Sequence, residues 1–218
     1  MSRGRIPPPP TPAEAVALQR RLAARVVRAR TFGPLRTVAG VDVGIHGDVA
    51  VAAVVRLAYP SLEVLETAMA RRPVDFPYVP GLLGFREVPV AAEACARLAA
   101  PPDLLLVDGH GLAHPRRFGV ACHLGVVLDL PAIGCGKSRL VGEHREPGTR
   151  RGSCTRLVDR GEVIGAVLRT REGVRPVVVS IGHRIDLETA VRVVLRCARR
   201  FRLPEPIRAA DRAAAEAP

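Results

Sequence analysis

The segment from Asp103 to Arg117, with the sequence DLLLVDGHGLAHPRR, constrains the fold more than any other part of this 218-residue chain. Its apolar run Leu104–Val107 predicts a buried strand that ends at Asp108 and a Gly-His-Gly turn. A carboxylate at the end of a buried strand is costly to desolvate unless a cation meets it. Glycine lets a ligand approach the backbone closely, and Arg116 and Arg117 can bind phosphate oxygens bidentately. The combination indicates a metal-dependent site that acts on a phosphodiester.

The charge balance favours a polyanionic partner. Lys and Arg number 33 against 21 Asp and Glu, which gives a formal net charge of +12. Because Lys137 is the only lysine, a general preference for Arg in the source genome is the alternative explanation. The chain has no Trp, and only 3% of its residues are aromatic, which argues against a broad base-stacking platform. No basic amphipathic segment dominates, so a membrane surface is disfavoured as a partner.

Cysteine usage and the chain start bear on the compartment. The five cysteines are widely spaced and form no C-x-x-C pair, so neither a zinc site nor a disulfide framework is indicated. We expect reduced thiols in a cytoplasmic protein. The first residues are Pro-rich and lack the apolar region of a signal peptide, and no apolar run approaches membrane-spanning length. Size and polarity favour a monomer.

Hydrophobic patterning predicts one α/β domain over residues 11–202, between a flexible Pro-rich N-terminus (1–10) and a flexible tail (203–218). Thr11 fits the N-cap of a first helix that runs to about residue 30. Three strands then follow without an intervening helix, which implies an antiparallel meander; they cover residues 37–45, 49–57 and 63–69.

The second half of the domain alternates between helices and strands. An Ala-rich helix after Pro89 precedes the strand at 104–107, and a helix within 118–128 precedes a strand at 131–135. This alternation implies parallel pairing with helices packed on the sheet. A second hairpin (163–170 and 175–180) and a final helix capped by Asp186 complete the domain.

Three acidic residues are candidate metal ligands. Asp42 alternates with Val41 and Val43, so its side chain points to the sheet face opposite theirs. Together with Asp108 it could offer Mg²⁺ the hard oxygen ligands that this ion requires. Glu87, just before a predicted helix, is a third candidate. The alternatives are a solvated edge Asp or an Arg-paired Asp, and a Glu that is merely favoured by the helix N-terminus.

Three further residues stand out. Lys137 is informative in an Arg-rich chain, because a lysine here suggests a need for a compact ammonium charge. His183 lies between Gly182 and Arg184, where a strand end could present it, although a structural histidine is equally consistent. Tyr78 is held between Pro77 and Pro80. Such a ring could wedge into a base stack, whereas packing on the core is the simpler interpretation.

Several motifs resemble those of the endonuclease V family, the deoxyinosine-specific repair nucleases. They are VDV (41–43), PYVPGLLGFRE (77–87), VDGHGLAHPRR (107–117), GCGKSRL (134–140) and GHRI (182–185). The resemblance extends in order and spacing over approximately residues 11–200. It implies an RNase H-like mixed sheet, an antiparallel meander followed by parallel strands, flanked by helices.

The resemblance also implies roles for individual residues. Mg²⁺, or Mn²⁺ in its place, is expected on Asp42, Glu87 and Asp108, with His183 and Lys137 supporting the water nucleophile and the scissile phosphate. The remaining positions form a wedge (Pro77, Tyr78, Val79, Pro80) and a base pocket (Gly81, Leu83, Gly109, His114). The expected reaction cleaves the second phosphodiester bond 3′ to deoxyinosine and leaves 3′-hydroxyl and 5′-phosphate ends.

Three other functions remain open at this point. One is an inosine-specific ribonuclease, whose site would have to read the 2′-hydroxyl. Another is a protein that binds deaminated bases in DNA without cutting, which retention of all three acids disfavours; single-stranded DNA is a further candidate partner. The G-V-D-V-G segment (40–44) is similar to the phosphate-binding turn of actin-like kinases, but the chain is too short for their two domains and has no P-loop.

Overall fold

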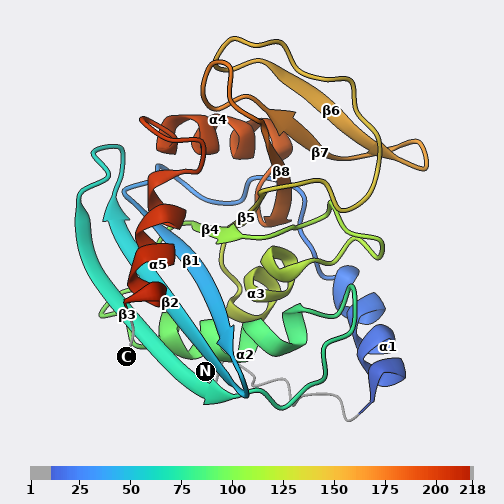
Figure 1. Ribbon diagram of the computed structural model, residues 1–218, viewed down its shortest axis with the longest axis vertical. Coiled ribbons are helices and arrows are strands. Elements are labelled where there is room, and N and C mark those ends of the chain that lie inside the picture. The colour runs from blue at the N-terminus through green and yellow to red at the C-terminus, as the bar shows by residue number, and fades with distance from the viewer. Residues whose placement is uncertain (1–10, 217–218) are drawn as a thin grey trace.

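An eight-stranded mixed sheet forms the centre of the structure, a computed structural model that describes residues 11–216 (Figure 1). The strand order across the sheet is β3-β2-β1-β4-β5-β8-β7-β6. The strands are β1 (Thr37–His46), β2 (Val49–Ala58), β3 (Val64–Pro73), β4 (Leu105–Asp108), β5 (Ala132–Gly136), β6 (Cys154–Asp159), β7 (Glu162–Leu168) and β8 (Val177–His183).

Helices cover both faces of this sheet. They are α1 (Pro12–Ala23), α2 (Gly84–Ala96), α3 (Val120–Leu128), α4 (Leu187–Cys197) and α5 (Glu205–Ala215). One face packs against α2 and α3, and the other packs against α4 and α5. Figure 1 shows α5, in red, lying over β1 and β2. No helix within residues 11–216 is both long enough and apolar enough to cross a membrane.

The pairing of the strands confirms the predicted order of a meander followed by parallel strands. β1, β2 and β3 pair antiparallel in sequence, whereas β1 pairs parallel with β4 and β4 pairs parallel with β5. In the register of β1 and β4, Val41 lies opposite Val107. The next residues along the two strands are Asp42 and Asp108, so this register brings the two acids side by side.

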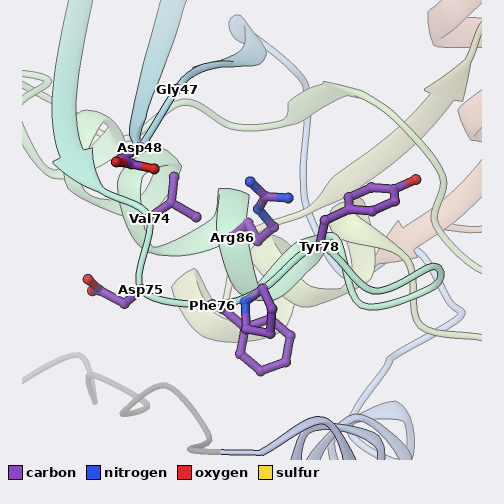
Figure 2. Close-up of a pocket in the computed structure, with 8 residues that line it drawn as sticks. Gly47, Asp48, Val74, Asp75, Phe76, Tyr78 and Arg86 are labelled. Carbon is purple, nitrogen blue, oxygen red and sulfur yellow. The ribbon is translucent and has the colours of Figure 1, made fainter.

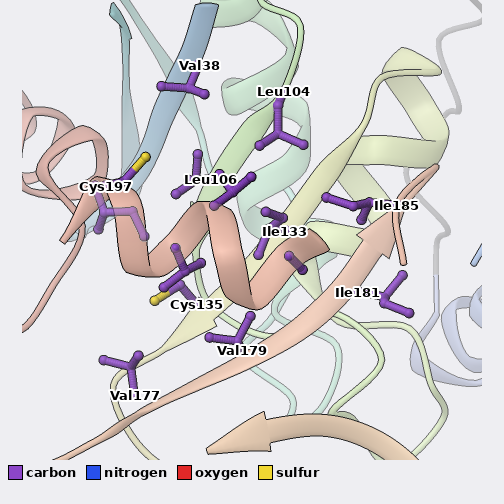
Figure 3. Packing of buried hydrophobic residues seen from close by; sticks show 14 of the residues in the cluster. Val38, Leu104, Leu106, Ile133, Cys135, Val177, Val179, Ile181, Ile185 and Cys197 are labelled. Atoms are coloured by element: carbon purple, nitrogen blue, oxygen red, sulfur yellow. The ribbon is translucent and has the colours of Figure 1, made fainter. Parts of the chain in front are cut away.

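The alternation of side chains along the strands separates the two cores. Ala39 and Val41 pack with the α2 and α3 side, whereas Val38 packs with the α4 and α5 side. Figure 3 shows the second core, where Leu106 and Ile133 from the central strands meet Cys197 of α4. These side chains are almost fully buried. A close-packed interior resists deformation, so the strand ends above it are held on a rigid platform.

Helix α5 corrects the prediction of a flexible tail over residues 203–218. Residues 205–215 are helical, and Ile207, Ala210 and Ala214 are buried at helical spacing. The buried face of α5 consists mainly of alanine, so the hydrophobic pattern that would predict a helix is weak. The small side chains of this face let the helix approach the sheet closely. The predicted flexible segment 1–10, like residues 217–218, lies outside the described residues.

Three smaller differences concern the ends of elements. α1 ends at Ala23 instead of near residue 30, and β6, which pairs with β7, was not predicted. α2 begins at Gly84, ahead of Pro89, so Glu87 lies in its first turn. Pro89 is the sixth residue of α2, so it lies beyond the first turn and removes one backbone hydrogen bond from the helix interior. The early start matters because it fixes the backbone that carries Glu87.

We expect Gly40→Ala to displace α5 from the sheet. A Cβ atom at Gly40 would lie 1.9 Å from the carbonyl oxygen of Pro206, which is backbone and has little freedom to move. The free energy of unfolding should fall by about 2 kcal/mol, as for an overpacked core, measured by urea denaturation. Gly33→Ala is the matched control, because a Cβ there meets nothing within 4 Å. Equal stabilities of the two variants would refute this account of α5 docking.

Candidate active site

Three carboxylates converge where β4 ends, beside the middle of β1. Asp42, Asp108 and Asp211 each offer an oxygen within 4.8 Å of the other two. Asp42 and Asp108 share the sheet face that α5 covers, because they follow Val41 and Val107 in register. α5 passes over Gly40 at Pro206. Five residues of helix advance about 7.5 Å and two residues of strand about 6.6 Å, so Asp211 arrives beside Asp42.

Sequence reasoning missed Asp211 because it fell within the predicted tail. A signal was present in the segment PEPIRAADRAAA, where Ile207, Ala210 and Ala214 recur at helical spacing. Two prolines at the start of this segment also fit the beginning of a helix. Nothing local, however, indicates that this helix crosses β1 at the position of the acids.

Glu87 lies close to this cluster without belonging to the mutually close group of three acids. It comes from the first turn of α2 and is coupled electrostatically to Asp42 and Asp108. Burial raises the pKa of Glu87 to about 8, with further increases from the charges of Asp42 and Asp108 against a smaller opposing effect of Arg86. The predicted set of Asp42, Glu87 and Asp108 is therefore brought into one neighbourhood, with Asp211 as an addition.

The pKa of Asp42 is also raised, to about 6. Burial is the largest cause, followed by the negative charges of Asp108 and Asp211, and the ammonium of Lys137 acts in the opposite direction. Carboxylates held this close repel one another when ionised, so at neutral pH the cluster must bind protons or a cation.

Lys137 supplies the cationic partner that the sequence suggested for Asp108. Its Nζ lies 2.6 Å from Asp108 Oδ2. The residue follows β5, in which Cys135 pairs with Asp108 across the parallel ladder, so the loop after β5 begins next to the acid. Burial acts to lower the pKa of the ammonium, but the hydrogen bond and charge of Asp108 outweigh it and the pKa rises.

His183 lies at the other end of the sheet. It pairs with Ala132, the first residue of β5, whereas Asp108 pairs with Cys135 near the end of that strand. Its Nδ1 accepts a hydrogen bond from the backbone N–H of Val27 at 3.3 Å, and its Nε2 lies 3.4 Å from Asp129 Oδ1. Because β8 runs antiparallel to β5, the last residue of β8 lies at the end of β5 that is farther from the acids. His183 therefore does not belong to the acid site.

The predicted wedge stands out from the surface. Tyr78 is 68% exposed, so it does not pack on the core, while Phe76 beneath it is buried. Pro77 and Pro80 are exposed and Val79 is half-buried. The side chain of Arg86 lies over the Tyr78 ring, with its guanidinium carbon 5.7 Å from the ring centroid. Figure 2 shows the two side chains beside a groove that Asp48, Val74 and Asp75 also line.

The four predicted base-pocket positions are only partly joined by contacts. His114 Nε2 lies 3.1 Å from the carbonyl oxygen of Gly81. Burial, and secondarily the charge of Arg116, lowers the pKa of His114 to about 4, so its ring is neutral at physiological pH. Leu83 is partly exposed just ahead of α2, and Gly109 follows Asp108 with a φ of +154°. Within residues 11–216, no hydrogen bond joins Leu83 or Gly109 to His114.

The three clustered carboxylates fit a hard divalent cation. Three carboxylate oxygens within 4.8 Å of one another provide the oxygen ligands that Mg²⁺ and Mn²⁺ bind. Burial, and after it the charges of the neighbouring acids, raises the pKa of Asp42 and Glu87, and a bound cation would offset both effects by stabilising the ionised carboxylates.

A mixed sheet of this order, with acids side by side on its neighbouring parallel strands β1 and β4, defines a nuclease of the RNase H-like class. The family model for endonuclease V matches residues 20–212. The chain belongs to the endonuclease V family.

Individual relatives agree with this assignment over nearly the whole chain. An endonuclease V from Roseiflexus sp. (strain RS-1) is 62% identical over 205 residues, which cover 94% of this chain and 92% of the relative. The crystal structure of an endonuclease V from Streptomyces avermitilis has a TM-score of 0.92 at 44% identity, covering 97% of this chain and 95% of that one.

A more distant structure includes nucleic acid. The endonuclease V of Ciona intestinalis, in complex with a 24-mer DNA that contains an inosine followed by a ribo-adenosine, has a TM-score of 0.82 at 27% identity. The match covers 94% of this chain and 96% of that one.

The raised carboxyl pKa values make stability depend on pH when no divalent cation is bound. The pKa of Glu87 is about 8 in the folded protein against 4.5 for an ordinary glutamate, so the folded state holds a proton that the unfolded chain has released. Stability from this proton is present below pH 4.5 and is lost as the pH rises toward about 8. In EDTA, the Tm of Glu87→Gln should therefore exceed that of wild type by an increasing margin over this interval.

Differential scanning calorimetry at several pH values measures this margin. Mg²⁺ should raise the Tm of wild type most at the alkaline end, where the acids are ionised and free to bind it. Glu172→Gln, a substitution of an exposed glutamate in the loop between β7 and β8, is the control. A margin that shrinks with rising pH would contradict the assigned shift.

Proposed function

We propose that the protein is a metal-dependent endonuclease that hydrolyses the second phosphodiester bond 3′ to deoxyinosine in DNA, leaving 3′-hydroxyl and 5′-phosphate ends. The observation that carries the proposal is the convergence of Asp42, Asp108 and Asp211 within 4.8 Å, in a chain of the endonuclease V family. Lys137 beside Asp108 adds a positive charge that could stabilise a scissile phosphate.

Asp42, Asp108 and Asp211 would hold Mg²⁺ or Mn²⁺, with Glu87 close enough to take part. When bound there, the metal would polarise the phosphate, lower the pKa of a water molecule and stabilise the leaving oxygen. Asp42 and Glu87 would give up their protons as the cation replaces them, so activity should rise with pH through the range of their raised pKa values. The ammonium of Lys137 would bind a non-bridging phosphate oxygen as a compact point charge.

The surroundings of the acids support an extruded base as the substrate. Tyr78 stands out from the surface on a segment that contains two prolines, which suits a ring that enters a base stack. Hypoxanthine pairs weakly, so its extrusion costs less free energy than that of a normal base. The complex of the Ciona intestinalis relative with inosine-containing DNA supports the same lesion.

RNA is the second candidate substrate. The DNA bound to the Ciona intestinalis relative contains an inosine followed by a ribo-adenosine, so that protein binds a strand with a ribonucleotide after the inosine. Parallel digestion of matched DNA duplex, single-stranded DNA and RNA, each with one inosine, separates the two substrates by their kcat/KM values.

Loss of any one carboxylate of the cluster should nearly abolish cutting. Asp42→Asn, Asp108→Asn and Asp211→Asn each remove a ligand charge while keeping side-chain size, and we expect kcat to fall roughly a thousand-fold. A gel assay with an end-labelled inosine duplex in Mg²⁺ measures the rate and the cut position, and EDTA should stop the reaction. Glu172→Gln, at an exposed position outside the cluster of three acids, is the matched control. Near-normal cutting by Asp211→Asn would remove that residue from the site.

Tyr78→Ala should weaken binding to an inosine duplex roughly ten-fold, because the loss of one stacking ring removes about that much affinity. Fluorescence anisotropy of labelled DNA in Ca²⁺ measures Kd without turnover. Tyr78→Phe retains the ring and should bind as wild type does. Equal affinities of all three proteins would reduce Tyr78 to a surface residue without a part in binding.

A further inference from the structure

A buried glutamine on α1 joins three distant segments of the chain. Gln19 is only 4% exposed, and its amide nitrogen donates hydrogen bonds to the carbonyl oxygens of Gly81 at 3.0 Å and Phe118 at 2.9 Å. Its amide oxygen accepts a hydrogen bond from Nε of Arg116. The side chain thus uses both of its amide hydrogens and its oxygen in the protein interior.

The carbonyl oxygen of Gly81 is the centre of this network. Besides Gln19, it accepts from Nη2 of Arg116 at 2.7 Å and from Nε2 of His114 at 3.1 Å. His114 is fixed as a donor there, because its Nδ1 accepts the backbone N–H of Arg116 at 3.1 Å and the ring is neutral. Gly81 has a φ of +78°, and a Cβ atom would lie 2.6 Å from Arg116 Nη2, so only glycine allows this approach.

The preceding turn of α1 makes an apolar contact with the same segment. Ala15, four residues before Gln19, belongs to a small buried cluster with Phe76, Leu82 and Phe85, against which Val79 also packs. α1 therefore holds the segment 76–82 in two ways, through apolar packing at Ala15 and through hydrogen bonds at Gln19. Tyr78, at the exposed tip of this segment, contacts Arg86 alone among the ring contacts of the described residues.

We propose that Gln19 is a positioning residue that fixes the segment 76–82, and through it the orientation of the exposed Tyr78 ring, for opening the duplex at the lesion. The inference rests on the proposed function and deepens it. A segment held by one carbonyl with three donors is pre-organised, so little ordering remains when DNA binds. Removal of Gln19 takes one of the three donors from the carbonyl oxygen of Gly81, the side-chain donor from that of Phe118 and the acceptor from Nε of Arg116, which favours local rearrangement of this segment.

Two substitutions separate the parts of the network. Gln19→Met keeps the size of the side chain and removes all three hydrogen bonds. Gln19→Glu keeps the acceptor for Arg116 and removes the donors to Gly81 and Phe118. Arg21→Met, on the exposed side of the same helix, is the matched control. If Gln19 acts through Gly81, both Gln19 variants should show the same change in Tyr78 mobility and the same change in kcat/KM.

The first measurement needs no substrate. The chain has no Trp and only two tyrosines, so in a Tyr59→Phe background all intrinsic tyrosine fluorescence comes from Tyr78. In time-resolved anisotropy, the amplitude of the fast depolarisation component should increase roughly two-fold in both Gln19 variants, because the Tyr78 ring becomes more mobile on the nanosecond timescale. The Arg21→Met protein should match the Tyr59→Phe parent. Unchanged depolarisation in both Gln19 variants would overturn the proposal.

The second measurement separates positioning from general stabilisation. With an inosine duplex, kcat/KM should fall roughly ten-fold in both Gln19 variants, whereas with single-stranded inosine DNA, which needs no opening, it should fall less than about two-fold. If Gln19 only stabilised the fold, kcat/KM would fall equally for both substrates, and that outcome also overturns the proposal. Wild-type protein that cuts neither substrate would refute the proposed function, and the Tyr78 anisotropy would then still decide whether Gln19 fixes the segment.

Discussion

The parallel pairing of β1 with β4 places two carboxylates side by side where β4 ends, and the rest of the site is arranged around their repulsion. Asp42 and Asp108 follow a register in which Val41 lies opposite Val107. The close-packed cores on both faces prevent the strands from separating to relieve this repulsion. The charge is met instead by Lys137 and by the protons that the raised pKa values of Asp42 and Glu87 retain. A divalent cation would replace those protons, which links metal affinity to catalytic competence.

The parts of the fold and site that the sequence predicts are those set by short-range pattern. The alternation in Val41-Asp42-Val43 indicates which sheet face carries the acid, and the buried run before Asp108 indicates the strand that carries the second. Lys137 is predictable because it is the one lysine in the chain and directly follows a strand. The meander and the parallel strands follow from the spacing of turns and helices. All of these inferences depend on residues within about ten positions of one another.

What the sequence does not predict depends on how distant elements cross. Asp211 reaches the acids only because α5 lies across β1 at Gly40, where the absence of a side chain leaves room for the backbone at Pro206. His183 is the opposite case, a predicted site residue that lies elsewhere. A histidine next to a glycine at a strand end resembles a site residue, yet the antiparallel pairing of β8 with β5 places it at the far end of the sheet. The direction of a strand within a mixed sheet is a tertiary property, and no local motif encodes it.

The proposed enzyme has to hold its metal-binding acids rigidly and also has to open the duplex with an exposed wedge. Different parts of the chain carry these two functions. The acids need fixed distances, and they lie on the central strands and on α5, which pack on a buried apolar core. The wedge needs to leave the surface and enter another molecule, so it lies on a segment between β3 and α2, where the described elements give it no sheet to pair with. Such a segment would lose ordering entropy on binding unless it is fixed beforehand. The hydrogen bonds of Gln19, His114 and Arg116 to Gly81 supply that fixation without occupying Tyr78 itself, which stays free to meet the strand.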